Sequence, residues 1–436
     1  MCAYPASLTV PTTLSPRFQL NVPGSKSMTN RALVLGALAR GRTRLRGALV
    51  AQDTEVMQDA LRKLGFSITR LDGAGEEIEI EGLGGRVPAA SAQLDLKLSG
   101  TSIRFIAALV ALGNGEYLLD GNERMRERPI GDLLQALNEL GVYAQAQLGN
   151  GCPPVLIRAS GLPGGEASVG GESSSQFLSA LLMAAPYAQN EITMRVTGEL
   201  QSKPFIDMTI GMMELFGAQV ERDGYERFRV PGNAYEGREL HIEGDAMAAG
   251  YFWAAAAVTE GEVVTGNMGS ESLQGDRRLA QVLQEMGCEV EWGPRSTRVR
   301  GPRGGRLRGG RFDLNDMPDQ AQTLAAIALF AGEPVEIVNV ANMRIKETDR
   351  LHALATELRK FGAVVDERED GLLVEPPTSI TPARVATYGD HRMAMALAIP
   401  GLRVPGTVIE DPGCVEKTYP DFFADLERFA SSGTEL

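Results

Sequence analysis

The sequence repeats a two-helix unit along its length, and this repeat restricts the fold more than any other feature. The first helix of each unit is expected to end in a bulky apolar residue followed by glycine, with a short β-like run after it. Five glycines mark these ends at intervals of 76, 76, 70 and 75 residues: Gly65, Gly141, Gly217, Gly287 and Gly362. Because glycine readily adopts the left-handed conformation just beyond a helix, the series predicts five helix C-termini. A sixth helix of this kind is expected before Phe429.

A second helix, rich in Ala and Leu, repeats in step with the first. We expect these helices to end at positions spaced 74, 74, 72, 71 and 74 residues apart: Gly41, Gly115, near Gln189, Gly261, Gly332 and Gly406. Runs such as Phe-Trp-Ala-Ala-Ala-Ala at 252–257 predict helices buried all round, whereas the charged first helices are expected to be half-exposed. Strand-like runs lie between the helices at 78–80, 155–157, 296–300 and 372–374. The repeat therefore predicts an α/β (α+β) fold of six units, each with two helices and several strands.

Each of the six Ala- and Leu-rich helices begins in polar, turn-like sequence. The starts at 23–27, 98–102 and 172–176 are rich in hydroxyl groups, and those at 243–246, 315–319 and 388–392 carry carboxylates. If the units pack around a shared axis, these starts meet at one end of the scaffold. The composition changes near residue 243, so we expect a domain boundary there and a site in the cleft between the two halves.

The first of these starts, Pro-Gly-Ser-Lys-Ser-Met-Thr-Asn-Arg at 23–31, has the composition of an anion site. Unpaired N–H groups and the partial positive charge at a helix N-terminus suit a phosphate. Lys26 adds a point charge, and Arg31 adds a planar guanidinium that can bind an oxyanion with two hydrogen bonds. The stretch is not a Walker A sequence, and an N-capped helix with surface cations is the alternative interpretation.

Loops that precede the first helices hold much of the remaining Arg and Lys. These loops are 121–129, 201–204, 342–350 and 414–420. Cations gathered on loops at one end of a scaffold indicate recognition of a multiply charged anion. Arg126 and Arg128 are expected to be solvated surface charges. Glu347, which lies among three cations, is expected to be held ionised or to be placed to pass a proton.

Length, charge and cysteine usage exclude several classes of protein. The chain has 436 residues, enough for two or three domains, and a net charge of −13, which argues against a nucleic-acid binder. The four cysteines, Cys2, Cys152, Cys288 and Cys414, form no C-x-x-C pair and are expected to be free thiols of a reducing compartment. The three histidines are too far apart for a zinc site. No signal peptide or membrane-spanning run is evident, so we expect a cytoplasmic protein without metal, membrane or nucleic-acid partners.

Eight motifs spread over nearly the whole chain carry a family resemblance. They are Pro-Gly-Ser-Lys-Ser-x-x-Asn-Arg-Ala at 23–32, Arg-Met-x-Glu-Arg-Pro-Ile at 124–130, Ser-Ser-Gln-Phe-Leu at 174–178, Ser-Lys-Pro at 202–204, Pro-Asp at 318–319, Asn-x-Arg-x-Lys-Glu-Thr-Asp-Arg at 342–350, Asp-His-Arg-Met-Ala at 390–394 and Lys-Thr-x-Pro-Asp at 417–421. With these motifs the sequence resembles the 5-enolpyruvylshikimate-3-phosphate synthases. The resemblance implies a monomer with two lobes of three βαβαββ units each, an inside-out α/β barrel with a hinge and an interdomain cleft. It implies an N-terminal lobe at 23–243 and a C-terminal lobe made of 1–22 and 244–436.

The resemblance also implies a reaction in the shikimate pathway to chorismate and the aromatic amino acids. The family transfers the enolpyruvyl group of phosphoenolpyruvate to the 5-hydroxyl of shikimate 3-phosphate, and phosphate leaves from a tetrahedral intermediate. By the same resemblance, Asp319 accepts the hydroxyl proton, Glu347 protonates the methylene carbon and Lys26 assists. The residues matched to shikimate 3-phosphate contacts are Lys26, Ser27, Arg31, Ser174, Ser175, Gln176, Ser202, Asp319, Asn342 and Lys346. Those matched to phosphoenolpyruvate contacts are Lys26, Gly100, Arg124, Arg350, Arg392 and Lys417, and no cofactor or metal is implied.

The sequence departs from the family pattern at two positions. Leu98 stands where the family commonly has Asn, which affects the expected binding of phosphoenolpyruvate and of glyphosate, the family's inhibitor. Phe205 stands where Tyr is usual, so stacking is kept and a phenol hydrogen bond is lost.

Two alternatives to this function remain. One is UDP-N-acetylglucosamine enolpyruvyl transferase, which has the same fold and donor. That enzyme normally has Asn after the first lysine of its site, and a Cys on a mobile loop acts as its acid. Here Ser27 follows Lys26, and no Cys lies in a matching loop. The other is a non-catalytic anion-binding protein, which the presence of both carboxylates and the cations disfavours.

Overall fold

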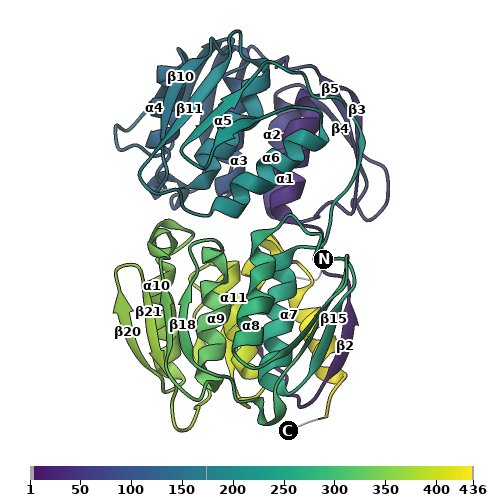
Figure 1. Cartoon of the computed structure of the whole chain (residues 1–436), viewed down its shortest axis with the longest axis vertical. Coiled ribbons are helices and arrows are strands. Elements are labelled where there is room, and N and C mark those ends of the chain that lie inside the picture. The colour runs from purple at the N-terminus through teal and green to yellow at the C-terminus, as the bar shows by residue number, and fades with distance from the viewer. Residues whose placement is uncertain (1–3, 173, 435–436) are drawn as a thin grey trace. The chain divides into compact units, whose positions relative to one another are not determined.

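The computed structural model describes residues 4–172 and 174–434, and the chain separates into two compact units (Figure 1). The N-terminal unit is Gly24–Ile242, and the C-terminal unit combines the segment up to Pro23 with the chain from Glu243 onward. Each unit has its own hydrophobic core. The chain therefore enters the N-terminal unit after Pro23 and leaves it after Ile242.

Three sheets build the N-terminal unit, and each has the same strand order. In every sheet, taken in spatial order, the first strand is parallel to the second, and the third pairs antiparallel with both the second and the fourth. The sheets are, in spatial order, β14 (Glu239–His241), β3 (Arg40–Arg46), β5 (Ile78–Leu83) and β4 (Ser67–Arg70); β6 (Ser91–Asp95), β7 (Asn114–Asp120), β9 (Val155–Ser160) and β8 (Tyr143–Ala146); and β10 (Gly165–Gly170), β11 (Ile192–Thr197), β13 (Arg227–Val230) and β12 (Glu221–Asp223).

The C-terminal unit repeats this plan in two sheets, and its third sheet has three strands. Its sheets are β2 (Arg17–Leu20), β15 (Glu262–Thr265), β17 (Thr297–Arg300) and β16 (Glu289–Trp292); β18 (Gly310–Asp313), β19 (Val335–Val338), β21 (Gly371–Glu375) and β20 (Val364–Arg368); and β22 (Arg384–Val385), β23 (Val408–Glu410) and β1 (Ser7–Thr9). The early strand β1 pairs antiparallel with β23 and occupies the edge of the last sheet. The βαβαββ repeat predicted from the sequence is thus confirmed, and the predicted strand-like runs fall in β5, β9, β17 and β21.

The strand that precedes α1 belongs to a sheet of the C-terminal unit, and the strand that precedes α7 belongs to a sheet of the N-terminal unit. Strand β2 comes directly before α1 in the sequence but pairs with β15 of the C-terminal unit. Strand β14 comes directly before α7 but pairs with β3 of the N-terminal unit. Both passages of the chain between units therefore fall between a first strand and the helix that follows it.

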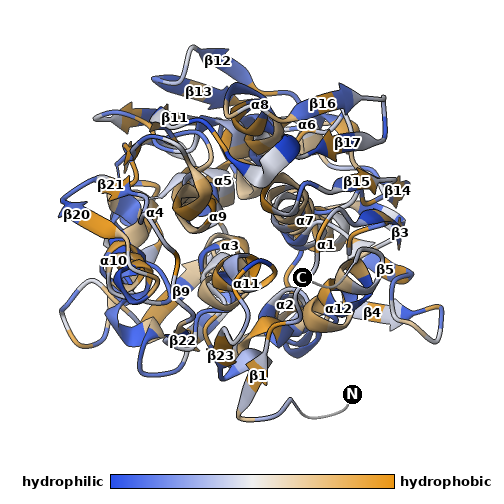
Figure 2. Ribbon diagram, turned by 90° about the horizontal axis from the view of Figure 1, so that it is seen from below, coloured by the Kyte–Doolittle hydropathy of each residue, from blue (hydrophilic) through white to orange (hydrophobic). Residues whose placement is uncertain are grey.

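The helices predicted to be buried form the inner layer of each unit. They are α1 (Lys26–Leu38), α3 (Gly100–Val110) and α5 (Ser175–Ala184) in one unit and α7 (Ala246–Thr259), α9 (Ala321–Ile327) and α11 (His391–Gly401) in the other. Every residue of α7 is buried, which its small alanine side chains permit, because the helix can approach neighbours on all sides. In Figure 2, α7, α9 and α11 lie towards the middle, and the strands of the C-terminal unit lie at the rim.

The charged helices are half-exposed, as predicted. They are α2 (Gln52–Lys63), α4 (Gly131–Glu139), α6 (Lys203–Leu215), α8 (Leu279–Glu285), α10 (Arg350–Lys360) and α12 (Phe422–Ser431). In Figure 2, α8, α10 and α12 lie at separate places around α7, α9 and α11. All five glycines of the first series have left-handed backbones, with φ between +88° and +105°. The prediction that they end these helices is confirmed, since only glycine adopts that conformation without strain.

The second glycine series marks helix ends less well than predicted. Helix α3 ends at Val110 and α7 at Thr259, before the expected Gly115 and Gly261. Within this series only Gly41 and Gly406 have positive φ. Gly115 already belongs to strand β7, so these glycines lie where the next strand begins rather than at a left-handed helix cap.

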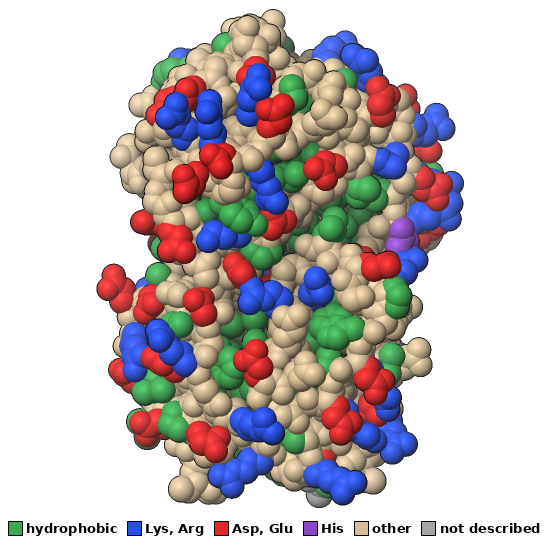
Figure 3. Space-filling view, viewed as in Figure 1, with side chains coloured by type: hydrophobic (Ala, Val, Ile, Leu, Met, Phe, Trp, Pro, Cys, Tyr) green, Lys and Arg blue, Asp and Glu red, His purple; other side chains and the backbone are tan. Residues whose placement is uncertain are grey.

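The surface mixes both signs of charge, as Figure 3 shows for one face. None of the described helices combines the length and apolar character needed to span a bilayer. Cys152, Cys288 and Cys414 are free thiols, as predicted, and Cys2 lies outside the described residues.

Candidate functional site

The start of α1 places a lysine beside a buried carboxylate in the N-terminal unit. Ser25 caps the helix, and its hydroxyl accepts the Met28 N–H at 3.4 Å. Lys26 is the first helical residue, and its Nζ lies 3.2 Å from Oδ2 of Asp53 at the start of α2. The Asp53 side chain is only 4% exposed, so the lysine is fixed by an ion pair close to the N-terminus of α1.

The start of α3 lies against Arg128. A Cβ atom on Gly100 would lie 2.7–2.9 Å from the Arg128 guanidinium, so only glycine leaves room for it. Arg128 also donates through Nη1 to the Leu98 carbonyl at 3.4 Å and is only 5% exposed. The guanidinium therefore lies directly at the N-terminus of a buried helix, where anions are favoured.

The expectation that Arg128 is a surface charge is therefore wrong, whereas the same expectation for Arg126 is confirmed. Arg126 is half-exposed and pairs with Asp120 at 2.7 Å. Arg128 precedes Pro129, which restricts its backbone to an extended conformation, and its φ of −86° and ψ of 125° fit that restriction. Pro129 restricts the backbone at Arg128 but does not by itself predict that this side chain, rather than that of Arg126, is buried.

Arg124, the arginine of this loop that the family motif singled out, lies on its outer side. Its Nη1 is 2.6 Å from Oε2 of Glu127, and about a third of its side chain is exposed. Arg128, rather than Arg124, lies against Gly100.

The start of α5 is joined to the start of α3 by a glutamine. Ser174 caps α5, and its hydroxyl accepts the Gln176 N–H at 3.3 Å. The Gln176 side chain donates to the Thr101 hydroxyl at 3.3 Å and accepts from Arg104 Nη1 at 2.7 Å. Ser175 is buried beside it, and residue 173 lies outside the described residues. The predicted residue Gln176 of α5 is thus bonded to two residues of α3 that were not predicted.

Arg31 is buried among neutral acceptors. It donates through Nε to the Thr209 hydroxyl at 2.8 Å, through Nη1 to the Ser27 carbonyl at 3.0 Å and through Nη2 to the Ser179 hydroxyl at 3.3 Å. Burial lowers the pKa of Arg31 to about 9. Arg31 therefore ties α1 to α5 and α6, whose N-cap Ser202 has a left-handed φ of +58°.

In the C-terminal unit, three cations surround Asp319. Its Oδ1 lies 3.0 Å from Arg350 Nη1 and 3.6 Å from Lys346 Nζ, and its Oδ2 lies 3.1 Å from Arg392 Nη2. Burial alone would raise the pKa of Asp319, but Lys346, Arg392 and Arg350 outweigh it and hold that pKa far below its usual range. Asp319 is therefore held in its ionised form.

Arg350 joins Asp319 to a second carboxylate, Glu347. Arg350 Nη2 lies 2.9 Å from Glu347 Oε2, and Glu347 Oε1 lies 2.7 Å from Lys417 Nζ. Arg350 is also paired through Nε with Asp390 at 2.6 Å, and its side chain is 2% exposed. Burial opposes the charge of Arg350, but Asp390, Glu347 and Asp319 raise its pKa above the ordinary value. The prediction that Glu347 lies among cations is confirmed.

Asn342, on the turn Ala341–Ile345, leaves a buried acceptor. Its Oδ1 has no hydrogen-bond donor in the described structure, and the residue is 8% exposed. A buried acceptor without a donor is costly, so this oxygen suits the hydroxyl of a ligand.

In addition to Arg128, four residues that contribute to these clusters were not among the site residues predicted from the sequence. They are Asp53, Arg104, Gln322 and Asp390. Gln322, oriented so that both ends of its amide are paired, accepts from Arg350 Nε at 2.9 Å and donates to the Asp319 carbonyl at 2.9 Å. Asp390 caps α11 by accepting the Arg392 N–H at 2.9 Å. Its sequence signals were an acid one residue before a buried helix and its place in the motif Asp-His-Arg-Met-Ala at 390–394.

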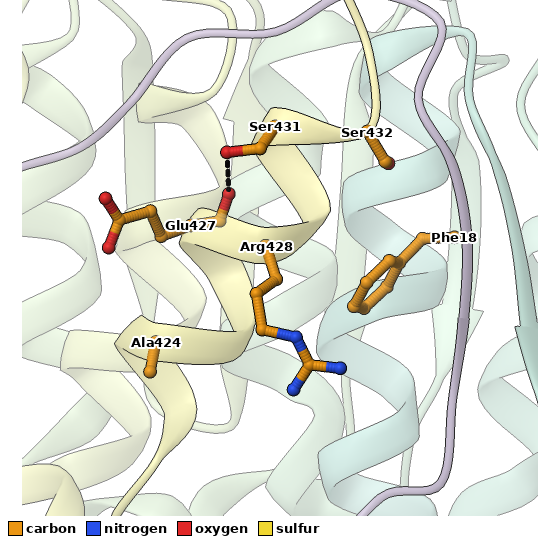
Figure 4. Close-up of a pocket in the computed structure, with 6 residues that line it drawn as sticks. All are labelled: Phe18, Ala424, Glu427, Arg428, Ser431 and Ser432. Atoms are coloured by element: carbon orange, nitrogen blue, oxygen red, sulfur yellow. Dashed lines mark hydrogen bonds between the residues drawn. The ribbon is translucent and has the colours of Figure 1, made fainter.

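Cations and carboxylates lie together in both clusters. The C-terminal cluster has four cations (Lys346, Arg350, Arg392 and Lys417) and three carboxylates (Asp319, Glu347 and Asp390). No group of His, Cys, Asp and Glu suited to a metal ion occurs among residues 4–172 and 174–434. A surface depression beside β2 and α12 contains none of these residues: its lining is Phe18, Ala424, Glu427, Arg428, Ser431 and Ser432 (Figure 4).

The fold consists of repeated βαβαββ modules. Helix starts rich in hydroxyl groups lie in one unit, and paired carboxylates lie among cations in the other. This combination indicates an enzyme that acts on anionic substrates. The family model described as EPSP synthase (3-phosphoshikimate 1-carboxyvinyltransferase) matches residues 16–426. The chain belongs to the EPSP synthase family, and the resemblance inferred from the sequence is confirmed. Enzymes of this family transfer the enolpyruvyl group of phosphoenolpyruvate to shikimate 3-phosphate.

Relatives from bacteria and plants agree with this assignment. A 3-phosphoshikimate 1-carboxyvinyltransferase from a Nostoc species is 47% identical over 405 residues, covering 93% of this chain and 94% of its own. The enzyme of that name from Shewanella sediminis is 46% identical, and the match covers 94% of this chain and 96% of the relative. The chloroplastic enzyme from Brassica napus is 45% identical, and the match covers 94% of this chain and 82% of the relative. The solved EPSP synthase of Acinetobacter baumannii has a TM-score of 0.79 at 25% identity and covers 97% of this chain and 98% of its own. Neither alternative function is favoured by these relatives.

Proposed function

We propose that this enzyme carries out the family reaction by addition and elimination, with Asp319 and Glu347 as its proton-transfer groups. The observation that carries the proposal is the guanidinium of Arg350, which is buried and bonded to both carboxylates. One cation thus fixes the spacing of two carboxylates whose surroundings differ, as a reaction with two proton transfers requires.

The chemistry assigns each carboxylate one proton. Asp319 is ionised and accepts the proton of the 5-hydroxyl as that oxygen attacks C2 of phosphoenolpyruvate. Glu347 in its protonated form gives a proton to the methylene carbon, which becomes a methyl group in the tetrahedral intermediate. Collapse breaks the carbon–oxygen bond to phosphate and returns a methyl proton to Glu347. The leaving phosphate takes the proton that Asp319 had accepted, so both carboxyl groups return to their starting state as the enolpyruvyl product and phosphate leave. Lys26 assists these proton transfers.

Shikimate 3-phosphate is assigned to residues of both clusters. In the N-terminal unit these are Lys26, Ser27, Arg31, Ser174, Ser175, Gln176 and Ser202, and in the C-terminal unit they are Asp319, Asn342 and Lys346. The support for this proposal is the network around Gln176 and the donor-free Oδ1 of Asn342, which suits a ring hydroxyl.

Phosphoenolpyruvate is assigned to the cations. The proposed contacts are Lys26, Gly100, Arg124, Arg350, Arg392 and Lys417, and we add Arg128 because its guanidinium lies on Gly100. Each charge-assisted hydrogen bond contributes about 1.5–3 kcal/mol, so several are needed to bind this small trianion from water.

We also propose that the enzyme is a monomer of the cytoplasm with no nucleic-acid or membrane partner, and that glyphosate is its inhibitor. The net charge of −13 supports the absence of a nucleic-acid partner.

A phosphate-release assay tests the function directly. The purified enzyme should release phosphate only when both shikimate 3-phosphate and phosphoenolpyruvate are present. Phosphate release only with UDP-N-acetylglucosamine as the acceptor would refute the proposal. No phosphate release with either acceptor would also refute it.

A further inference from the structure

A short turn of the C-terminal unit places a buried carboxyl group behind Asp319. The turn η3 (Gly275–Arg278) is fastened to the start of α7 by Gln274. Gln274 accepts the Ala246 N–H at 3.0 Å and donates to the Gly244 carbonyl at 2.7 Å. Asp276, two residues on, is 3% exposed. The fold therefore fixes this carboxyl group, which the proposed mechanism does not use, inside the protein.

Two acceptor oxygens at this place lack donors. Asp276 Oδ1 and Gln320 Oε1 are both buried without a hydrogen-bond partner in the described structure. Gln320 directly follows Asp319 in the sequence, and its amide donates to the Asp276 carbonyl oxygen at 3.4 Å. Gln320 also packs against Gly250 of α7, where a Cβ would lie 2.9–3.0 Å from its amide. A carboxylate at Asp276 cannot supply the missing donor, whereas a carboxylic acid has an O–H to give.

The charges that face Asp276 oppose its ionisation on balance. They are the carboxylates of Asp319, before α9, and Asp245, before α7, and the guanidinium of Arg392, at the start of α11. Arg392 is already bonded to Asp319 at 3.1 Å. Tyr251 of α7 is uncharged, since burial raises its pKa to about 12.

The two arginines on the turn itself do not change this balance. Arg277 lies over the Trp292 ring at 5.9 Å, and Arg278 pairs with Asp316. Burial, with the help of Asp319, raises the pKa of Asp276 to about 7, although Arg392 opposes the shift.

We propose that Asp276 is a positioning residue that the fold keeps as a neutral carboxylic acid, so that Arg392 stays bonded to Asp319. If Asp276 loses its proton, a second carboxylate competes for the same guanidinium. Arg392 is then drawn away from the Asp319 side of the cluster, and an incoming anion meets one more negative charge. Deprotonation of Asp276 therefore weakens anion binding at Arg392 as the pH rises.

The first test measures the proton without any ligand. Difference titration of the wild-type enzyme against Asp276→Asn should show one proton released with a midpoint near pH 7. If Asp276→Asn does not fold, difference infrared spectra of the wild type between about pH 5 and pH 9 should show a carboxylic acid that deprotonates near pH 7. A midpoint near pH 4 in either measurement overturns the proposal.

The second test measures positioning and rests on the proposed function. The KM for phosphoenolpyruvate should rise several-fold from about pH 6 to pH 8.5 in the wild type and less in Asp276→Asn, with ionisation of the substrate cancelling in the comparison. Identical pH profiles of KM overturn the positioning role, because a merely structural residue would shift stability and not this difference. An enzyme without activity towards phosphoenolpyruvate would refute the proposed function and leave the titration result standing.

Discussion

Arg350 and Asp390 form a buried ion pair, in which Arg350 Nε donates to Asp390 Oδ2 at 2.6 Å and neither side chain is more than 2% exposed. Asp390 also caps α11 through the Arg392 N–H. One carboxylate thus orients two of the arginines assigned to phosphoenolpyruvate. This arrangement leads to the first prediction.

Replacing Asp390 with Ala should destabilise the C-terminal unit and impair the reaction. The change leaves the Arg350 charge buried with one partner fewer and removes the helix cap, so the free energy of unfolding should fall by about 3–5 kcal/mol in urea denaturation. Asp366→Ala, at an exposed ion pair with Arg368, should change it by less than about 1 kcal/mol. Equal effects of the two changes would contradict the structural role assigned to Asp390.

The contact between Arg128 and Gly100 predicts a difference between neighbouring arginines. Arg128→Ala should raise the KM for phosphoenolpyruvate roughly tenfold or more, because it removes a cation at the start of α3. Arg126→Ala, which removes an exposed pair with Asp120, should change KM less than about twofold. Steady-state kinetics decide the matter, and a larger effect at Arg126 would show that Arg128 is not a ligand.

The two carboxylates bridged by Arg350 should both be needed for turnover. Asp319→Ala and Glu347→Ala should each lower kcat by about 100-fold or more, since each removes a proton-transfer group. Circular dichroism should show the fold intact in both variants. A variant that keeps a near-normal kcat would refute the role assigned to that residue.

The turn before α1 depends on a glycine. A Cβ at Gly24 would lie 1.9 Å from the Gly47 carbonyl oxygen, so Gly24→Ala must displace one of the two loops. We expect a loss of about 1–3 kcal/mol in the free energy of unfolding and a higher KM for both substrates, because Lys26 moves with the turn. Gly73→Ala is the matched control, since a Cβ there has no neighbour within 4 Å among the described residues. Similar stabilities of the two variants would show that the turn adjusts freely.

Leu98 should affect inhibition by glyphosate. The residue precedes α3, and its carbonyl accepts from Arg128 Nη1, so its side chain borders the proposed anion site. Leu98→Asn adds an amide donor there and should lower the glyphosate concentration needed for half inhibition. Leu148→Asn, at an exposed site of the same unit, should leave the inhibition curve unchanged. Superimposable curves for Leu98→Asn and the wild type would remove Leu98 from the site.

Much of the fold follows from patterns that the sequence shows locally. The glycines that end the outer helices, such as Gly65 and Gly362, are required by backbone conformation alone, so their spacing revealed the repeat. The inner helices follow from composition, because a helix as rich in alanine as α7 can be stable only when buried. The motifs of the helix starts were sufficient to indicate the family and both carboxylates.

The sequence by itself determined the repeat, the family and the kinds of side chain at the helix starts. Only the tertiary structure decided which cations face inward: Arg128 does and Arg126 does not, although they lie two residues apart. It also placed Asp276 near Asp319, which follows it by 43 residues in the chain. Helix ends and buried faces are set by neighbours within a few residues, whereas the partner and the protonation state of a charged group are set by segments that only packing brings together.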